Sequence, residues 1–207
     1  LCESDENTWG LDVDDLRRLC EKAPPAIVLL VHVLGVPCKM KEISELRDEF
    51  GFLLIEDSCA AFGSSPVGTV GEISTYSTYY GHQFSTIEGG FVCANGDEGA
   101  DILRMLRAHG WAADCAEATR KRVAKAAKVD PFREKFTFYV PGFNVRGTDL
   151  QAHLGLSQLA AVDAWTARRK ENHNRYAAHF YGSKDFVIQR PEQGSEVSSI
   201  GFGILAA

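Results

Sequence analysis

Two apolar segments with a helix-like segment between them determine the class of fold that this chain adopts. Residues 26–34 form an apolar run, interrupted only by His32 and rich in β-branched side chains, and residues 52–55 form a second, shorter run. Buried parallel strands have this composition. Between the runs, apolar side chains recur every three or four residues, as on one face of a helix, at Met40, Ile43, Leu46 and Phe50. The order strand, helix, strand predicts a right-handed crossover in an α/β fold with a mostly parallel central sheet flanked by helices.

Later segments continue this pattern less regularly. Short strands are predicted at residues 73–77 and 90–93. A helix is predicted over residues 97–108, and its buried side would carry Ile102, Leu103 and Leu106. The polar stretch that ends near residue 130 is predicted to lie at the surface, because it is rich in alanine and lysine.

The last third of the chain predicts two consecutive helices. The first runs from Thr148, a plausible N-cap, to about Arg168, and the second is a polar helix over residues 170–181. The apolar side chains of the first helix are Leu150, Leu154, Leu159, Val162 and Trp165. The second helix is predicted to lead into another domain.

Composition and charge exclude several classes of function. The net charge of the 207 residues is −6, which argues against a nucleic-acid-binding surface because phosphates require a basic partner. The sequence contains no run of about 18 apolar residues and no signal-peptide pattern, and it therefore predicts a cytoplasmic protein without a membrane span. The six cysteines are widely spaced, which predicts reduced thiols rather than zinc or iron–sulfur ligands.

Asp57 follows the second apolar run closely, near the carboxyl end of the predicted strand. Open α/β sheets bind ligands at this edge, and a carboxylate there can pair with a protonated pyridine nitrogen. Asp57 can also be an acidic loop residue or a helix cap, and its position alone does not decide between these roles.

Two further candidates lie in residues 77–90, which read Ser-Thr-Tyr-Tyr-Gly-His-Gln-Phe-Ser-Thr-Ile-Glu-Gly-Gly. An isolated histidine in a loop rich in glycine and tyrosine, such as His82, is more often structural or exposed than catalytic. A lone serine at a strand end, such as Ser77, is usually a turn former. Only their fixed spacing from each other and from Glu88 makes them candidates.

Three segments together resemble the DegT/DnrJ/EryC1/StrS family of sugar aminotransferases. They are residues 56–60 (Glu-Asp-Ser-Cys-Ala), residues 77–90, and residues 138–152 (Phe-Tyr-Val-Pro-Gly-Phe-Asn-Val-Arg-Gly-Thr-Asp-Leu-Gln-Ala). In that family, the position six residues before the glutamate of Glu-Gly-Gly carries the lysine that binds pyridoxal phosphate. Here this position is His82, which has no primary amine for covalent attachment but can still transfer protons. Within the family, this replacement marks a group of nucleotide-sugar 3-dehydratases.

The resemblance implies a role for each candidate. Asp57 would be the partner of the pyridinium nitrogen, Ser77 a ligand of the cofactor phosphate, and His82 the catalytic acid and base. Asn144 would reach across a dimer interface to the cofactor phosphate of the other subunit, although an asparagine after Pro-Gly is also a common turn residue. Arg146 could touch phosphate or join the interface, and both alternatives stay open. The chain departs from the family at Ala60, where many members have glutamine.

The resemblance also implies a domain organisation and an activity. Residues 1–168 would be an aspartate-aminotransferase-like large domain, incomplete at its N-terminus, and residues 169–207 a connecting helix and the truncated start of a small C-terminal domain. The implied enzyme is a 3-dehydratase of a nucleotide-linked 4-keto-6-deoxyhexose in deoxysugar or lipopolysaccharide biosynthesis. It would use non-covalent pyridoxal or pyridoxamine 5′-phosphate, an amino donor such as glutamate, and a homodimer. A sugar aminotransferase, a dehydrase with an iron–sulfur partner and a non-catalytic cofactor-binding homologue remain alternatives.

Overall fold

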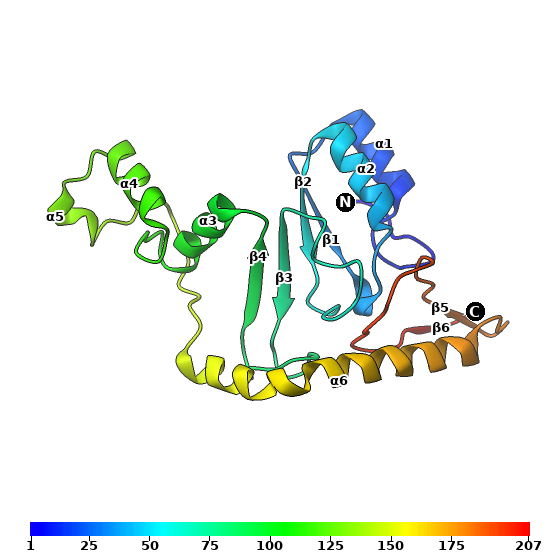
Figure 1. Cartoon of the computed structure of the whole chain (residues 1–207). Helices are drawn as coiled ribbons and strands as arrows, with labels where there is room; N and C mark the ends of the chain where they lie inside the picture. Colours follow the sequence, from blue (N-terminus) through cyan, green and yellow to red (C-terminus); the bar gives the residue numbers. More distant parts are fainter. The chain divides into compact units, whose positions relative to one another are not determined.

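The computed structural model describes all 207 residues, which form two compact units. The first unit joins Leu1–Phe91 to Leu150–Ala207, and the second unit is Val92–Asp149. Figure 1 shows the helices and strands along the chain. None of the helices combines the length and the apolar composition that are needed to cross a bilayer.

The central sheet has four strands in the order β1-β2-β3-β4 (Figure 1). They are β1 (Ile27–Val31), β2 (Leu53–Asp57), β3 (Ile73–Ser77) and β4 (Gly90–Ala94). β1 pairs in parallel with β2, and β2 pairs in parallel with β3. Because α2 (Met40–Phe50) connects β1 to β2, the predicted crossover and the mostly parallel α/β fold are confirmed.

The hydrophobic core of the first unit lies between this sheet and two helices, α1 (Val13–Lys22) and α2. α1 begins after Asp12, whose carboxylate accepts a hydrogen bond from the Asp15 amide and so caps the helix. The buried side chains are Leu16, Cys20, Val28, Leu30, Met40, Ile43, Leu46, Phe52 and Leu54. Burial of each of the larger ones contributes about 1.5–3 kcal/mol, so this cluster is the main source of hydrophobic stability.

The first strand is shorter than the apolar run that predicts it. After β1 the chain turns through η1 (Val33–Gly35), in which Leu34 has a φ of 55°. The run extends past the strand because the residues that follow also turn toward the interior, where His32 is fully buried and Val33 and Leu34 are half-buried. Within the strand, apolar residues alternate between the buried face and an exposed face that carries Ile27, Leu29 and Val31.

The second strand is longer than predicted, because it includes Glu56 and ends at Asp57. Glu56 is fully buried, and its carboxylate accepts hydrogen bonds from the amides of Gly68, Val70 and Gly71 at 2.6, 2.9 and 2.5 Å. It also accepts a bond from His32 Nε2 at 3.0 Å. These four donors make a buried carboxylate in a strand tolerable.

The same contacts determine the ionisation of Glu56. His32 Nδ1 accepts a hydrogen bond from the Cys38 amide, so Nε2 carries the proton that His32 donates to Glu56. Burial opposes the charged form of the carboxyl group, but the hydrogen bonds from His32 and from the Gly71 and Gly68 amides outweigh it. The pKa of Glu56 is therefore held below its usual value.

We expect Glu56→Gln to destabilise the protein by about 3–5 kcal/mol at pH 7, because an amide NH2 would face main-chain or imidazole N–H donors in the interior. Glu45→Gln, at an exposed position of α2, is the matched control and should change stability by less than about 0.5 kcal/mol. Urea unfolding of the full-length protein measures both variants.

The pH dependence provides a second test of this carboxylate. A lowered folded pKa stabilises the protein above the unfolded pKa of about 4.3, and this contribution is lost as the pH falls through the folded value. The stability difference between the wild type and Glu56→Gln should therefore shrink below about pH 4.3. A difference under about 1 kcal/mol at pH 7 would contradict the importance of the four hydrogen bonds.

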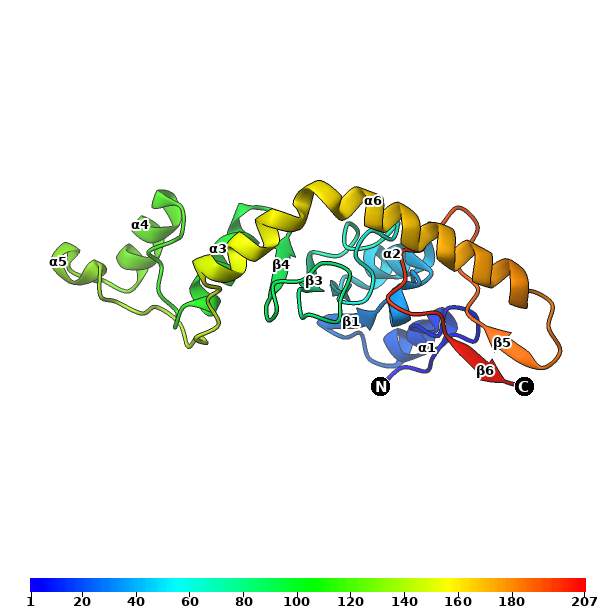
Figure 2. The ribbon, with the colours of Figure 1, turned by 90° about the horizontal axis from the view of Figure 1, so that it is seen from below.

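The final part of the first unit contains a helix of 32 residues, α6 (Asp149–Phe180), which Figure 2 shows as one unbroken helix. The prediction of two helices with a break near Arg168 is wrong. Of the apolar side chains in the first predicted helix, Leu150, Leu159 and Trp165 are exposed, and the buried residues of α6 are Gly155 and His173. β5 (Phe186–Ile188) and β6 (Ile204–Ala206) then form an antiparallel pair. The domain boundary expected after residue 168 stays a prediction.

The second unit contains α3 (Asp97–Arg107), α4 (Glu117–Ala126) and α5 (Pro131–Glu134) around a small cluster of Met105, Ala112 and Cys115. The predicted buried side of α3 is wrong for Ile102, which is 44% exposed. Asp101 takes the buried position instead, because its carboxylate accepts hydrogen bonds from the Ala116 amide and from Arg104. Hydrogen bonds to Thr119 and Arg104 hold the pKa of Asp101 below its usual value.

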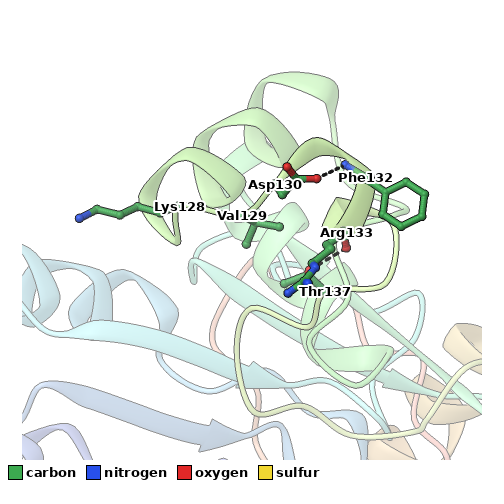
Figure 3. A pocket seen from close by; sticks show the side chains of 6 residues that line it. All are labelled: Lys128, Val129, Asp130, Phe132, Arg133 and Thr137. Atoms are coloured by element: carbon green, nitrogen blue, oxygen red, sulfur yellow. Dashed lines mark hydrogen bonds between the residues drawn. The ribbon is translucent and has the colours of Figure 1, made fainter.

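The second unit has a cavity of about 640 Å³. Figure 3 shows the side chains that line it, which are Lys128, Val129, Asp130, Phe132, Arg133 and Thr137. Asp130 accepts a hydrogen bond from the Phe132 amide, and Thr137 donates one to the Arg133 carbonyl (Figure 3). The Lys128 side chain points away from these residues. None of the site residues predicted from the sequence lines this cavity.

Candidate active site

Two of the predicted site residues end neighbouring parallel strands. Asp57 is the last residue of β2, and Ser77 is the last residue of β3. In the sheet register, Val31 pairs with Asp57, and Asp57 pairs with Thr75. The carboxyl ends of these strands therefore meet at one edge of the sheet, where α/β proteins bind their ligands.

The carboxylate of Asp57 is half-buried and oriented by two contacts. Its Oδ1 accepts hydrogen bonds from the Cys59 amide at 3.0 Å and from the Thr75 hydroxyl at 3.5 Å. Both bonds use Oδ1, so Oδ2 is available to another donor. Burial and then the hydrogen bond to Asp57 raise the pKa of the Cys59 thiol. This thiol is therefore neutral at pH 7.

Residues 78–89, here called the His82 loop, fold back between β3 and β4. The Thr78 amide donates to the Gly89 carbonyl at 2.9 Å, and the Thr86 amide donates to the Thr78 carbonyl at 2.8 Å. The hydroxyls of Thr78 and Thr86 bond to each other at 2.6 Å in the interior. Gly89 has a φ of 137°, and a Cβ at this position would lie 2.9 Å from the Thr86 hydroxyl. The base of the loop is thus closed tightly, and glycine is required there.

His82 lies near the tip of this loop and is half-buried. Its ring meets the Tyr79 ring edge-on, with 6.3 Å between centroids. Nδ1 is buried and has no hydrogen-bond partner. Nε2 is therefore the ring nitrogen that can exchange a proton with a bound molecule.

Ser77 contributes a hydroxyl just before the loop. Its Oγ accepts a hydrogen bond from the Tyr79 amide at 3.2 Å, which leaves the hydroxyl hydrogen free to donate. Glu88, to which the sequence assigns no role, acts through its main chain. The Glu88 carbonyl accepts hydrogen bonds from the Thr86 hydroxyl at 2.9 Å and from Gln151 at 2.7 Å.

Asn144 belongs to the second unit, and its side chain is exposed. It forms a β-bridge with Ala108, and its Oδ1 accepts a hydrogen bond from Arg146 at 3.5 Å. The structure brings Asp57, Ser77 and the His82 loop to one sheet edge within the first unit. The role of Asn144 as a phosphate ligand of another subunit stays a prediction.

Sequence reasoning missed the residues that hold the His82 loop. Gln83, within the loop, donates to the Ala60 and Ser198 carbonyls, and Gln158 donates to the Ser85 carbonyl of the loop. Neither glutamine has an assigned role in the sequence interpretation. One signal was present, because Gln151, Gly155 and Gln158 follow one another at intervals of four and three, which places them on one face of a helix.

The fold and this edge of the sheet define a protein of the pyridoxal-phosphate-dependent aminotransferase-like class. The profile of the DegT/DnrJ/EryC1/StrS aminotransferase family matches residues 1–206. The chain therefore belongs to the DegT/DnrJ/EryC1/StrS aminotransferase family, as its three segments predict.

Individual relatives narrow the comparison. The chain is 29% identical over 205 residues to GDP-4-keto-6-deoxy-D-mannose 3-dehydratase of Yersinia pseudotuberculosis, covering 97% of this chain and 51% of that protein. It is 34% identical over 209 residues to dTDP-4-dehydro-2,6-dideoxy-D-glucose 3-dehydratase of Saccharopolyspora spinosa, covering 95% of this chain and 45% of that protein.

The fold of the chain also matches that of a solved structure of such a 3-dehydratase. The E. coli GDP-4-keto-6-deoxy-D-mannose-3-dehydratase with bound hydrated PLP superposes with a TM-score of 0.83 at 26% identity, covering 100% of this chain and 53% of that one. The chain thus spans about half the length of the relatives that it matches.

Proposed function

We propose that the full-length protein is a nucleotide-sugar 3-dehydratase that acts on a 4-keto-6-deoxyhexose and holds pyridoxal or pyridoxamine 5′-phosphate without a covalent bond. The observation that carries this proposal is His82, an imidazole at the position where the family has its cofactor-binding lysine. The relatives support the substrate class, since they are named as 3-dehydratases of a GDP-linked and a dTDP-linked sugar. The homodimer and the cytoplasmic location are part of the same proposal.

The residues at the sheet edge fit such a cofactor. Nε2 of His82 and Oδ2 of Asp57 are the polar atoms that a bound group could contact, since Nδ1 of His82 is buried and both hydrogen bonds to Asp57 use Oδ1. Ser77 adds a hydroxyl donor for a phosphate oxygen. Asn144 would complete the phosphate site from a second subunit. When bound, the cofactor would supply an electron sink for the charge left after a proton is removed.

Asp57 and His82 would have different tasks in this reaction. Asp57 would hold the ring nitrogen of the cofactor, because a carboxylate favours the protonated form of a neighbouring pyridine nitrogen. His82 Nε2 removes a proton and later returns one, because an imidazole exchanges protons near neutral pH. With no amine at position 82, the side chain there would form no covalent bond to the cofactor.

The overall reaction balances with glutamate as amino donor and reductant. The sugar exchanges its C3 hydroxyl for hydrogen and glutamate becomes 2-oxoglutarate, with release of one ammonia. An ordinary transamination would instead leave the amino group on C4 of the sugar and release no ammonia. Ammonia release therefore separates the proposed function from that of an aminotransferase.

We expect the full-length protein, supplied with pyridoxal phosphate, glutamate and a GDP- or dTDP-linked 4-keto-6-deoxyhexose, to release one ammonia per sugar consumed. Mass spectrometry should show a product that is lighter by one oxygen atom. Borohydride treatment before intact-mass measurement should leave the protein mass unchanged. An amino sugar without ammonia, or a reduced cofactor adduct on the protein, would contradict the proposal.

A further inference from the structure

The side chain that follows His82 fastens the His82 loop to two other segments. Gln83 is only 7% exposed, and its Nε2 donates hydrogen bonds to the Ala60 carbonyl at 2.6 Å and to the Ser198 carbonyl at 3.0 Å. Ala60 lies three residues after Asp57 in the sequence. Gln83 therefore connects the segment that carries His82 to the segment that carries Asp57.

A second glutamine holds the same loop from α6. Gln158 Oε1 accepts a hydrogen bond from the Ser85 amide at 3.2 Å, and its Nε2 donates to the Ser85 carbonyl. Both main-chain groups of one loop residue are thus bound by a single side chain. One helical turn away, a Cβ at Gly155 would lie 3.2 Å from Phe84 and Thr86, so glycine allows the loop to lie close to the helix.

The segment that Gln83 reaches through Ser198 is itself fixed to α6. Arg169 donates a hydrogen bond to the Ser199 carbonyl at 3.3 Å, and His173 Nδ1 lies 3.1 Å from the Ser199 hydroxyl. Burial lowers the pKa of His173, which keeps this imidazole neutral at pH 7. Gln158 therefore attaches the loop to α6 directly, and Gln83 attaches it to the segment of Ser198 and Ser199, which α6 holds through Arg169 and His173.

We propose that Gln83 and Gln158 are positioning residues, whose side-chain amides hold the backbone of the His82 loop and set the place of His82 relative to Asp57. This inference rests on the proposed function for the task of His82. An amide is required at both positions, because Gln83 uses two N–H donors and Gln158 uses a donor and an acceptor at once. A leucine of similar size would leave these main-chain groups unpaired.

The test compares Gln83→Leu, Gln158→Leu and Gln158→Glu in the full-length, cofactor-loaded protein. Ser157→Ala is the matched control, since Ser157 is exposed next to Gln158 and bonds only within its helix, to the Leu154 carbonyl. In both leucine variants, we expect hydrogen exchange of residues 82–88 to become about 10- to 100-fold faster, with little change in the rest of α6. Gln158→Glu keeps the acceptor for the Ser85 amide but sets a carboxylate oxygen against the Ser85 carbonyl, so it should loosen the loop as the leucine variants do.

A positioning role also predicts changes at His82 itself. The NMR titration midpoint of the His82 imidazole should move in the leucine variants and not in Ser157→Ala. The kcat should fall about 10- to 100-fold while KM for the sugar changes by less than about threefold, and the pH profile of kcat should shift with the His82 midpoint.

The outcomes separate this inference from the proposed function. Exchange rates and a His82 midpoint equal to those of Ser157→Ala would overturn the inference, and so would a loosened loop with the kcat and pH profile of the wild type. If the wild type dehydrates no sugar, the proposed function fails, while exchange and His82 titration still decide whether the amides hold the loop. Should Gln83→Leu not fold, Gln158→Leu and Gln158→Glu decide by the same measurements.

Discussion

Replacing His82 with asparagine should lower the kcat of the full-length protein by about 100- to 10,000-fold, the range that general acid–base catalysis contributes. Asparagine can form hydrogen bonds but cannot take up and return a proton near neutral pH. The fold should be unaffected, because the structure shows no side-chain hydrogen bond of His82 and Nδ1 is unpaired. Steady-state kinetics, with thermal unfolding as the check on folding, measure this effect.

The second variant, His82→Lys, tests whether position 82 lies close enough to the cofactor for a covalent bond. It places a primary amine where the family has its lysine, so we expect the protein to capture the aldehyde form of the cofactor covalently. Borohydride treatment should then increase the intact mass by one reduced cofactor, which the wild type should not show. Dehydration should fall, and transamination at C4 is the activity to look for.

A His82→Asn protein that dehydrates its sugar at the wild-type rate would show that another group moves the proton. A His82→Lys protein with no adduct would show that position 82 lies out of reach of the cofactor aldehyde. The first result would overturn the proposed mechanism, and the second would overturn the placement of the cofactor at this edge of the sheet.

Asp57→Asn should lower kcat by about 100- to 1000-fold, because an amide cannot support the positive charge of the ring nitrogen. The substitution keeps the Oδ1 acceptor for the Cys59 amide and the Thr75 hydroxyl, so the end of β2 should keep its conformation. The loss should therefore fall on the chemical step, with a smaller change in KM. Steady-state kinetics and the cofactor content of the purified protein measure these effects.

Asp48→Asn is the matched control for this substitution, since Asp48 is exposed on α2, outside the candidate site. It removes the same charge from the protein and should leave kcat unchanged. Full activity of Asp57→Asn with normal cofactor content would show that a different residue faces the ring nitrogen.

The parts of the fold with strong hydrophobic patterning are those that the sequence predicts well. The crossover from β1 through α2 to β2 follows from two apolar runs and one helical face, and β3 has the predicted bounds. The placement of Asp57 and Ser77 at one edge also follows, because parallel strands that neighbour each other end at the same side. These features depend on burial over short stretches of chain, which a sequence records directly.

The helices that pack through polar contacts are predicted poorly. α6 buries Gly155 and His173 rather than its leucines, and it holds its neighbours through side-chain bonds to main-chain groups. On α3, Asp101 is buried, whereas Ile102, which the sequence pattern assigns to the buried side, is exposed. Hydrophobic periodicity cannot show such contacts, because the partner of each polar side chain is set by the tertiary structure.

The hydrogen bond from Gln83 to the Ser198 carbonyl determines when the site can form during protein synthesis. The two residues are 115 positions apart in the chain, and Gln189 contacts Thr8 across 181 positions. At a synthesis rate of about 5–20 residues per second, Ser198 is made roughly 6–23 s after Gln83. The hydrogen bond between Gln83 and the Ser198 carbonyl cannot form before then. Contacts of such long sequence separation also form late and slowly in refolding. The loop that carries the proposed catalytic base can thus acquire its final shape only after residue 198 has been made.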